Sequence, residues 1–482
     1  MASDWPLRLR THASIVVLLL SFAALYATTL HSYGMFMWDE AEYASLGRSV
    51  TRGEGFSISG APNALRPPLL PLAIAAGVRF GHSTEDVVVK LATLPFTLLA
   101  LWVVYWFAAT HYDRATGLTA ATLLGIGPTF WTSTALVLTE IPFMAFFTAA
   151  VGCFYRGLYH DARAFYWSSL CVGLALMTRY TATLFAPIAL VFVIVALLSG
   201  DPTVRRRIFS WHFLLSPLVA VALTTPWFVR QQVTFGDALT GVRQASTQLQ
   251  VYIPGVSMPW DYYLLQLPEM LSPLLLGCVV AGVAWSIYRR DRCGMHCILV
   301  VVLLGVWFSY YRYKEVRLVT SVLPFMAVLA ALGITQLTPR HRVLRPLGIV
   351  MIVGTAFALN FTHTRSTFTR TIANGYPSFL QAMAFLHGHT TADAAVMGAS
   401  RPQIYWYADR RSVNFPTESD LPAALQNVEW VIITNFERGQ KSYVRDLVKR
   451  PELANAPEAI FVFHDAQFAT VLMRADWLRR HL

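Results

Sequence analysis

Long apolar runs recur along most of this chain, and they constrain its fold more than any other feature. A helix needs about 20 consecutive apolar residues to cross a bilayer core of about 30 Å. About eleven runs reach or approach that length. They predict an all-α polytopic membrane protein, with spans expected at residues 13–30, 87–109, 115–136, 138–157, 164–180, 181–199, 209–229, 264–287, 296–312, 316–337 and 343–360.

The composition agrees with a membrane protein. Only 13% of the 482 residues are charged and 55% are hydrophobic, whereas a soluble domain has about 25% charged residues. The formal net charge of +11 would suggest nucleic acid in a soluble protein. Here the arginines stand in short loops between apolar runs, and no nucleic-acid-binding motif is found. Membrane lipids, not nucleic acid, are therefore the expected surroundings.

Arginine placement predicts the orientation of the spans. If the N-terminus is cytoplasmic, the arginine-rich loops, such as those at 205–207 and 289–292, lie on the cytoplasmic side, as the positive-inside rule requires. No small-residue cleavage site follows the first run, so it is expected to remain as a span. An odd number of spans places the C-terminus outside. We expect a multi-pass protein of the plasma (inner) membrane.

The last part of the chain changes character. Short apolar runs at 394–398, 430–434, 459–463 and 469–473 alternate with the helical stretches 378–386 and 441–449, which is typical of a small α/β domain. No phosphate-binding glycine loop or nucleophile elbow is found in it. The chain is thus expected to divide into a transmembrane module, residues 1–360 with an outer loop at 31–86, and an extracytoplasmic α/β domain, residues 361–482.

The segment Trp38-Asp39-Glu40-Ala41-Glu42-Tyr43 places three carboxylates directly after the first span. One interpretation is structural: Asp39 is a helix N-cap, and the other acids favour the first turn through the helix dipole. The other is that Asp39 is a general base where lipid and water meet, with its pKa raised by partial desolvation. Residue spacing alone leaves both interpretations open.

A second acid, Glu140, stands in Thr139-Glu140-Ile141-Pro142 between two apolar runs. An ionisable group in such a place is costly and usually has a partner or a function. Because Pro142 suits a first helical turn, Glu140 could also be only a capping residue. We favour a function, since Glu140 and Asp39 are expected at the same membrane depth.

Four cations are expected at the outer boundary, against the positive-inside bias: Arg66, Arg179, Lys314 and Arg317. A phosphate at the membrane surface would explain them, since Arg and Lys bind phosphate by charge-assisted hydrogen bonds. Snorkelling to lipid headgroups is the alternative for each. Arg179 is the strongest candidate because its neighbours are the most apolar.

A metal site is not indicated by spacing. Cys293, His296 and Cys297 lie close in sequence, but no second pair of ligands accompanies them. The favoured interpretation is that they are membrane-boundary residues. No cofactor is predicted with certainty, and a divalent metal stays open.

Together these motifs resemble the GT-C membrane glycosyltransferases. They look closest to glycosyltransferase family 39, the branch with protein O-mannosyltransferases and the aminoarabinose transferase. The similarity covers about residues 10–360 in order and arrangement. It rests on Asp39-Glu40 with Tyr43 after a first span, Arg66-Pro67-Pro68-Leu69, Thr139-Glu140-Ile141-Pro142, Thr178-Arg179-Tyr180-Thr181 and Lys314-Glu315-Val316-Arg317.

The resemblance implies a GT-C helical bundle that transfers a hexosyl or pentosyl group, with inversion, from a polyprenyl-phosphate sugar. That lipid-linked sugar is a substrate and not a cofactor. The resemblance gives the catalytic role to Asp39, with Glu40 beside it. The acceptor, a lipid, a glycan or a protein, stays open. The expected substrate-binding residues are Tyr43, Arg66, Glu140, Arg179, Lys314 and Arg317.

Two other classes fit a polytopic chain. A transporter or lipid flippase often has two repeated halves and charges near the bilayer midplane, whereas here no repeat is found and the charges gather at one face. A membrane scaffold whose tail binds partners is the second alternative. An outer-facing acidic cavity with a lipid groove would favour transfer, and a midplane cavity would favour transport.

Overall fold

The computed structural model describes residues 5–30, 34–35, 37–251, 257–338, 343–373, 376–437, 440–449, 456 and 458–482. Residues 31–33 and 36 of the expected outer loop lie outside this set. The internal contacts divide the chain into two compact units. The first unit contains residues 1–31, 64–73 and 90–368, and the second contains residues 32–63, 74–89 and 369–482.

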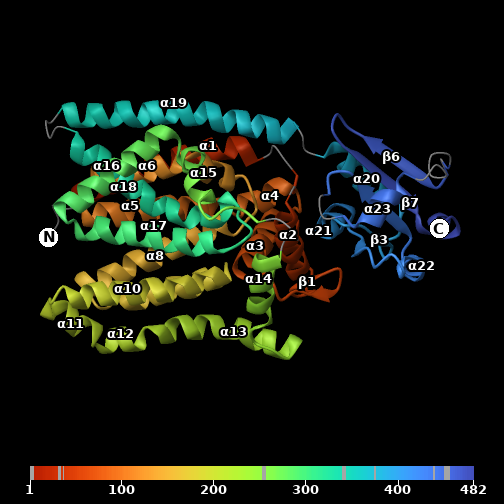
Figure 1. Cartoon of the computed structure of the whole chain (residues 1–482), viewed down its shortest axis with the longest axis horizontal. Helices are drawn as coiled ribbons and strands as arrows, with labels where there is room; N and C mark the ends of the chain where they lie inside the picture. Colours follow the sequence, from red (N-terminus) through yellow and green to blue (C-terminus); the bar gives the residue numbers. More distant parts are fainter. Residues whose placement is uncertain are drawn as a thin grey trace. The chain divides into compact units, whose positions relative to one another are not determined.

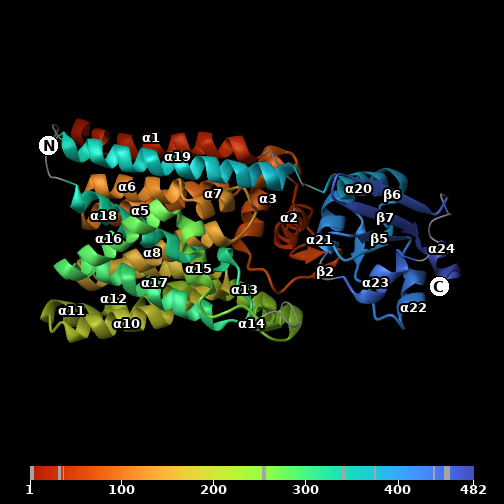
Figure 2. The same cartoon turned by 45° about the horizontal axis from the view of Figure 1, so that its top comes forward.

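The first unit is a bundle of helices that run side by side (Figures 1 and 2). The long helix α19 lies beside α1 in both views. The bounds are α1 (Trp5–Leu30), α5 (Leu94–His111), α6 (Arg114–Gly125), α7 (Pro128–Thr134), α8 (Glu140–Tyr159), α9 (Ala164–Leu176), η1 (Tyr180–Leu184), α10 (Phe185–Leu198), α11 (Pro202–Ile208), α12 (Trp211–Leu215), α13 (Pro217–Phe235), α14 (Thr240–Val251), α15 (Tyr262–Leu271), α16 (Pro273–Arg289), α17 (Arg292–Tyr310), η2 (Val316–Val322), α18 (Leu323–Leu337) and α19 (Leu344–Ala373).

Within the described residues, seven helical stretches are long and apolar enough to cross a membrane: 86–111, 140–159, 180–198, 202–235, 292–310, 316–336 and 344–366. Helices α15 and α16 would together add an eighth, but they are bent by 111° at a break. The other predicted spans also coincide with helices, namely α1, α6 with α7, and α9. The polytopic all-α prediction is confirmed, while the expected count of about eleven exceeds the seven or eight that pass this length test.

Glycine permits a close crossing of α16 with α18. A side chain at Gly282 of α16 would collide with the backbone of Leu329, and one at Gly333 of α18 would collide with the backbone of Cys278. Small residues allow backbones to approach in this way where lipid supplies no hydrophobic drive between helices.

The second unit contains a mixed five-stranded sheet in the order β4-β3-β5-β7-β6. Strand β3 pairs in parallel with β4 and β5, while β7 pairs antiparallel with β5 and β6. All four predicted strands and both predicted helical stretches are present. The short β4 was not predicted. The bounds are β3 (Ala395–Met397), β4 (Arg411–Val413), β5 (Trp430–Thr434), β6 (Ile460–His464), β7 (Ala469–Arg474), α20 (Pro377–His389), α21 (Arg401–Gln403), η3 (Ile404–Ala408), α22 (Leu421–Ala424), η4 (Leu425–Asn427), α23 (Ser442–Leu447) and α24 (Ala475–Arg480).

Alternating side chains of this sheet give it two apolar faces. On one face Ile432 of β5 packs with Phe379 and Met383 of α20. On the other, Val431 packs with a cluster that includes Val444 of α23 and Leu478 of α24. The predicted small α/β domain is therefore present.

The second unit also contains most of the expected outer loop. Its elements are α2 (Trp38–Thr51), the hairpin of β1 (Ser57–Ile58) and β2 (Ala61–Pro62), and parts of α3 (Leu69–Gly81) and α4 (Asp86–Leu91). Helix α3 begins directly after Pro68. Because α2 packs against α21 and η3, the outer loop and the C-terminal segment share one compact unit.

Candidate active site

Helix α2 carries the acidic segment predicted to do the chemistry. Met37 is the residue before its first turn, and the Glu40 carboxylate accepts a hydrogen bond from the Met37 backbone N–H at 3.1 Å, as in a capping box. Asp39 therefore stands inside the first turn and is not the N-cap. Its side chain is half-buried, whereas Glu40 is fully buried.

The other polar residues of this helix face the interior of the second unit. Glu42 is buried and accepts a hydrogen bond from Asn63 Nδ2 at 2.8 Å. Tyr43 is buried as well. Of the four residues Asp39, Glu40, Glu42 and Tyr43, only Asp39 is partly exposed.

In the first unit the structure brings Glu140 and Arg179 together. Arg179 Nη1 lies 2.5 Å from Glu140 Oε1, and the two side chains are 18% and 4% exposed. Glu140 is the first residue of α8, while Arg179 lies in the turn between α9 and η1. The second oxygen of Glu140 is buried and has no hydrogen-bond partner among the described residues. Glu140 thus has a partner, which is one of the two outcomes expected of an ionisable group between apolar runs, while its predicted function stays a prediction.

Hydrogen bonds to one carbonyl fix the segment that leads to Arg66. Ala64 O accepts from Tyr180 Oη at 3.2 Å and from Gln231 Nε2 at 3.0 Å. Trp227 Nε1 donates in turn to the Tyr180 hydroxyl at 3.0 Å. Helix α13 and the turn that holds Arg179 thus meet at this carbonyl.

A further backbone bond fixes the same segment on its other side. The Leu69 N–H donates to Met177 O at 2.9 Å, two residues before Arg179. Arg66, which is half-buried, is therefore held between two attachments to the turn of Arg179. These two predicted cations belong to one local arrangement within the first unit.

Lys314 and Arg317 occupy the entry to η2, which packs against α8. Lys314 is only 2% exposed, and its ammonium donates to Tyr311 O at 2.5 Å and to Met258 O at 3.1 Å. Burial lowers the Lys314 pKa from its ordinary value. Arg317 forms an ion pair with Glu315. The chain itself occupies much of the donor capacity of both side chains.

The structure therefore groups the predicted residues in two sets. Arg66, Glu140 and Arg179 form one arrangement in the first unit, whose α8 also packs against η2. Asp39, with Glu40 and Tyr43, belongs to the second unit.

Several polar residues of the structure were not predicted from the sequence. In the first unit Arg230 lies over the Trp227 ring, 4.9 Å from its centroid, and interacts electrostatically with Tyr180. It is a further cation at this end of α13. The sequence signal that could have identified Arg230 is its position directly after a long apolar run, a feature that it shares with the predicted cations.

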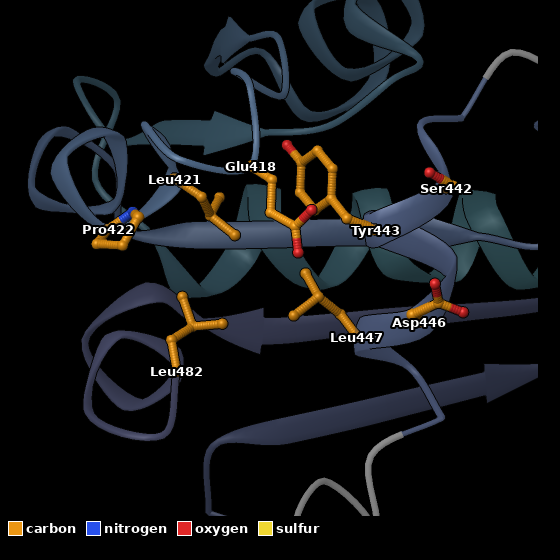
Figure 3. Close-up of a pocket in the computed structure, with 8 residues that line it drawn as sticks. All are labelled: Glu418, Leu421, Pro422, Ser442, Tyr443, Asp446, Leu447 and Leu482. Atoms are coloured by element: carbon orange, nitrogen blue, oxygen red, sulfur yellow. The ribbon is translucent and has the colours of Figure 1, made fainter.

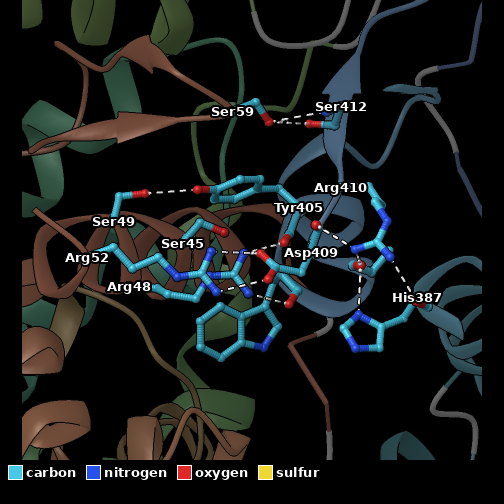
Figure 4. Close-up of polar contacts among 12 residues, drawn as sticks. Ser45, Arg48, Ser49, Arg52, Ser59, His387, Tyr405, Asp409, Arg410 and Ser412 are labelled. Carbon is cyan, nitrogen blue, oxygen red and sulfur yellow. Dashed lines mark hydrogen bonds and ion pairs between the residues drawn. The ribbon is translucent and has the colours of Figure 1, made fainter. Parts of the chain in front are cut away.

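In the second unit the unpredicted residues gather around the contact between α2 and η3, and Figure 4 labels four of them, Arg48, Arg52, Tyr405 and Asp409. Nothing local in the sequence marks them, since their partners stand more than three hundred positions away. They are Arg48, Arg52, Asp86, Arg401, Tyr405, Trp406, Tyr407 and Asp409.

A separate hollow of about 270 Å³ lies on the C-terminal domain (Figure 3). Glu418 and Asp446 supply carboxylates to its wall, and Tyr443 an aromatic ring. It contains none of the predicted site residues. Across the described part of the chain, no three His, Cys, Asp or Glu side chains are grouped as a metal site would require.

These features define a polytopic membrane protein with the GT-C architecture: a helical bundle and a small sheet domain, with a buried acid and cations at a helix boundary. The model of a family described as dolichyl-phosphate-mannose-protein mannosyltransferase matches residues 65–229, which include Arg66, Glu140 and Arg179. No curated protein matches the sequence.

Solved structures show the same fold. ArnT from Cupriavidus metallidurans, bound to undecaprenyl phosphate, is 14% identical with a TM-score of 0.75, and the match covers 98% of each chain. The Archaeoglobus fulgidus oligosaccharyltransferase in its apo form is 15% identical with a TM-score of 0.62, over 97% of this chain and 75% of that one. The arabinofuranosyltransferase AftD from Mycobacteria is 15% identical with a TM-score of 0.55, over 86% and 35%. The GT-C fold that the sequence motifs implied is confirmed.

Proposed function

We propose that this protein is a glycosyltransferase that moves a sugar from a polyprenyl-phosphate carrier to an extracytoplasmic acceptor. The observation that carries the proposal is the arrangement of Arg66, Arg179 and buried Glu140 within residues 65–229, the stretch matched by the mannosyltransferase family model. The undecaprenyl phosphate in the ArnT structure supports the class of donor. The orientation is the one predicted from arginine placement, with a cytoplasmic N-terminus in the plasma (inner) membrane.

The cations of the first unit bind the donor phosphate. Arg179 has four donor hydrogens beyond the one given to Glu140, and the segment that carries Arg66 is hydrogen-bonded to Met177 and Tyr180, close in sequence to Arg179. Lys314 and Arg317 add positive charge near α8. Fixed charges of this kind stabilise the negative charge that develops on a leaving phosphate, and each is worth about 100-fold or more in rate.

Asp39 is the general base. The acceptor hydroxyl gives its proton to the Asp39 carboxylate while its oxygen forms a bond to the anomeric carbon. The bond between that carbon and the phosphate oxygen breaks, and the polyprenyl phosphate leaves with the electron pair. Attack from the face opposite the phosphate inverts the anomeric centre. Because the Glu40 carboxylate caps α2, we assign Glu40 to holding this turn and not to proton transfer.

The test is to incubate purified protein in nanodiscs with undecaprenyl-phosphate sugars and to follow release of undecaprenyl phosphate by mass spectrometry. Asp39→Asn should lower the rate by a factor of about 100 to 10,000, the usual contribution of general base catalysis. Glu40→Gln is the matched control, since Gln also serves in a capping box. Turnover of Asp39→Asn near that of the wild type would remove Asp39 from the mechanism, and movement of intact donor across liposomes without turnover would favour a flippase. Repeating the assay with EDTA tests whether a divalent metal is needed.

A further inference from the structure

The segment 401–409 of the C-terminal domain forms α21 and η3, and both of these helices pack against α2. Helix α2 is polar overall, yet every residue from Glu40 to Ser49 is buried. A polar helix cannot be held there by an apolar stripe alone. Its partners are therefore the main determinant of where its first turn, with Asp39, is placed.

Arg48 makes the central contact (Figure 4). Its side chain is 5% exposed. Nη1 donates to Trp406 O at 2.8 Å and Nη2 donates to Tyr405 O. The guanidinium also lies over the rings of both residues, 4.6 and 5.0 Å from their centroids. The carbonyls at a helix end lack hydrogen-bond partners within the helix. Arg48 donates to two such carbonyls at the end of η3.

The C-terminal end of α2 is bound again through Asp409, which follows η3. Arg52 donates to both Asp409 oxygens at 2.9 Å, and Arg48 Nη2 lies 3.3 Å from the same carboxylate. Apolar packing accompanies these bonds, since Leu46, Ile58 and Tyr405 form a small core.

The N-terminal end of α2 is attached to the same segment by Tyr407. Its hydroxyl accepts a hydrogen bond from Met35 N, four residues before Asp39, and donates to Asp86 Oδ2 at 2.7 Å. Asp86 Oδ1 accepts from Trp406 Nε1 at 2.9 Å. The chain on either side of the acidic turn is therefore bonded to η3.

The segment is itself held by the body of the domain. Arg410 donates to Ala408 O at 3.2 Å and to Thr390 O and His387 O at 2.7 and 2.8 Å. His387 Nδ1 lies 3.1 Å from Ala408 O. Hydrogen bonds thus connect α20 with α2 through η3.

From this arrangement we infer that Arg48 and Tyr407 are positioning residues for Asp39: the C-terminal domain fixes both ends of α2 so that the carboxylate is presented in one orientation. The inference rests on the proposed function, because it needs Asp39 to act as the base. Arg48 stands nine residues after Asp39, about 14 Å along the helix axis, so it acts through the rigid helix and does not touch the reacting atoms.

The first test is kinetic. Arg48→Met and Tyr407→Phe should lower kcat about 10- to 100-fold, the loss expected when a reacting group moves by about 1 Å. The KM for the undecaprenyl-phosphate sugar should stay unchanged, because the donor contacts are elsewhere. Arg48→Lys, which keeps the charge and one donor direction, should recover part of the loss. Arg411→Gln is the control: Arg411 of β4 is exposed and its side chain donates to Asn427 O, so its kcat should stay near that of the wild type.

The second test is independent of turnover. Hydrogen–deuterium exchange of the peptide spanning 35–44 should rise in Arg48→Met and Tyr407→Phe and stay at the wild-type level in Arg411→Gln. Unchanged exchange and unchanged kcat in both variants would overturn the inference, as would a rise in KM alone. If the wild type transfers no sugar but exchange rises as expected, the proposed function fails while the attachment of α2 stands. If Arg48→Met does not fold, Arg48→Lys and Tyr407→Phe decide the result.

Discussion

The ion pair of Glu140 and Arg179 allows the structural role of Arg179 to be separated from its role in binding phosphate. Arg179→Met removes one partner of a pair whose acid is 4% exposed, and leaves a buried carboxylate without its cation. Removing one member of a buried pair costs about 3–5 kcal/mol. Because Arg179 is 18% exposed, we expect the low end, about 3 kcal/mol. The double variant Glu140→Gln/Arg179→Met leaves no unpaired charge and should recover most of that loss.

The assay compares stability with turnover in the same four proteins. Unfolding in mixed SDS micelles, followed by tryptophan fluorescence, gives the free energies for the wild type, both single variants and the double variant. Turnover should stay at least about 100-fold below wild type in the double variant, because the phosphate still lacks Arg179. If the double variant recovers turnover together with stability, Arg179 serves only as the partner of Glu140 and the phosphate assignment is wrong. A cost below about 1 kcal/mol for Arg179→Met would refute the argument from burial.

Three further outcomes are expected. The hydrogen bonds from Arg52 lower the pKa of Asp409. Ionised Asp409 therefore stabilises the folded protein fully above the ordinary pKa of about 3.9, and this stabilisation is lost as the pH falls through the lowered pKa. The melting temperatures of Asp409→Asn and the wild type should differ at pH 7 and converge in strong acid. Burial raises the pKa of Glu437 to about 7, so stability falls as the pH rises from about 4 to 7, since the unfolded chain loses that proton first; Glu437→Gln should raise the melting temperature at pH 8 and leave it unchanged near pH 4. Gly282→Leu should lower the free energy of unfolding by about 1–3 kcal/mol or more through overpacking against α18. Gly277→Leu, at a position on the same helix with open space, should have the same melting temperature as the wild type.

The elements that could be predicted from the sequence are those defined by local patterns. Apolar runs identified the helices of the first unit because lipid requires long apolar segments whatever their neighbours are. Short β-branched runs such as Trp430–Thr434 identified the sheet for a similar reason, since its strands are bounded by polar turns. The span count was less secure because hydropathy does not detect a bend such as the one between α15 and α16.

Pairings across the chain could not be predicted in this way. The partner of Glu140 stands 39 positions away, and only the fold of α8 against the turn after α9 brings the two together. Motif order made Arg179 a candidate but gave no reason to join it to Glu140. Arg48 lies 357 and 358 positions from its carbonyl partners. No periodicity in the sequence of α2 or of η3 predicts this contact.

The burial of α2 also changes how its charges are interpreted. From the sequence, one interpretation of the acids after the first span is structural, in which they only cap a helix and favour its first turn. In the structure Glu40, Glu42 and Arg48 are all buried, and burying a charge is costly unless it is hydrogen-bonded or paired. Each of these three has such a bond, so each is engaged in holding the helix. Asp39 stands in the same turn and is half-buried, so its carboxylate is more accessible than those of Glu40 and Glu42, and the proposal that Asp39 is the base rests on this difference in exposure.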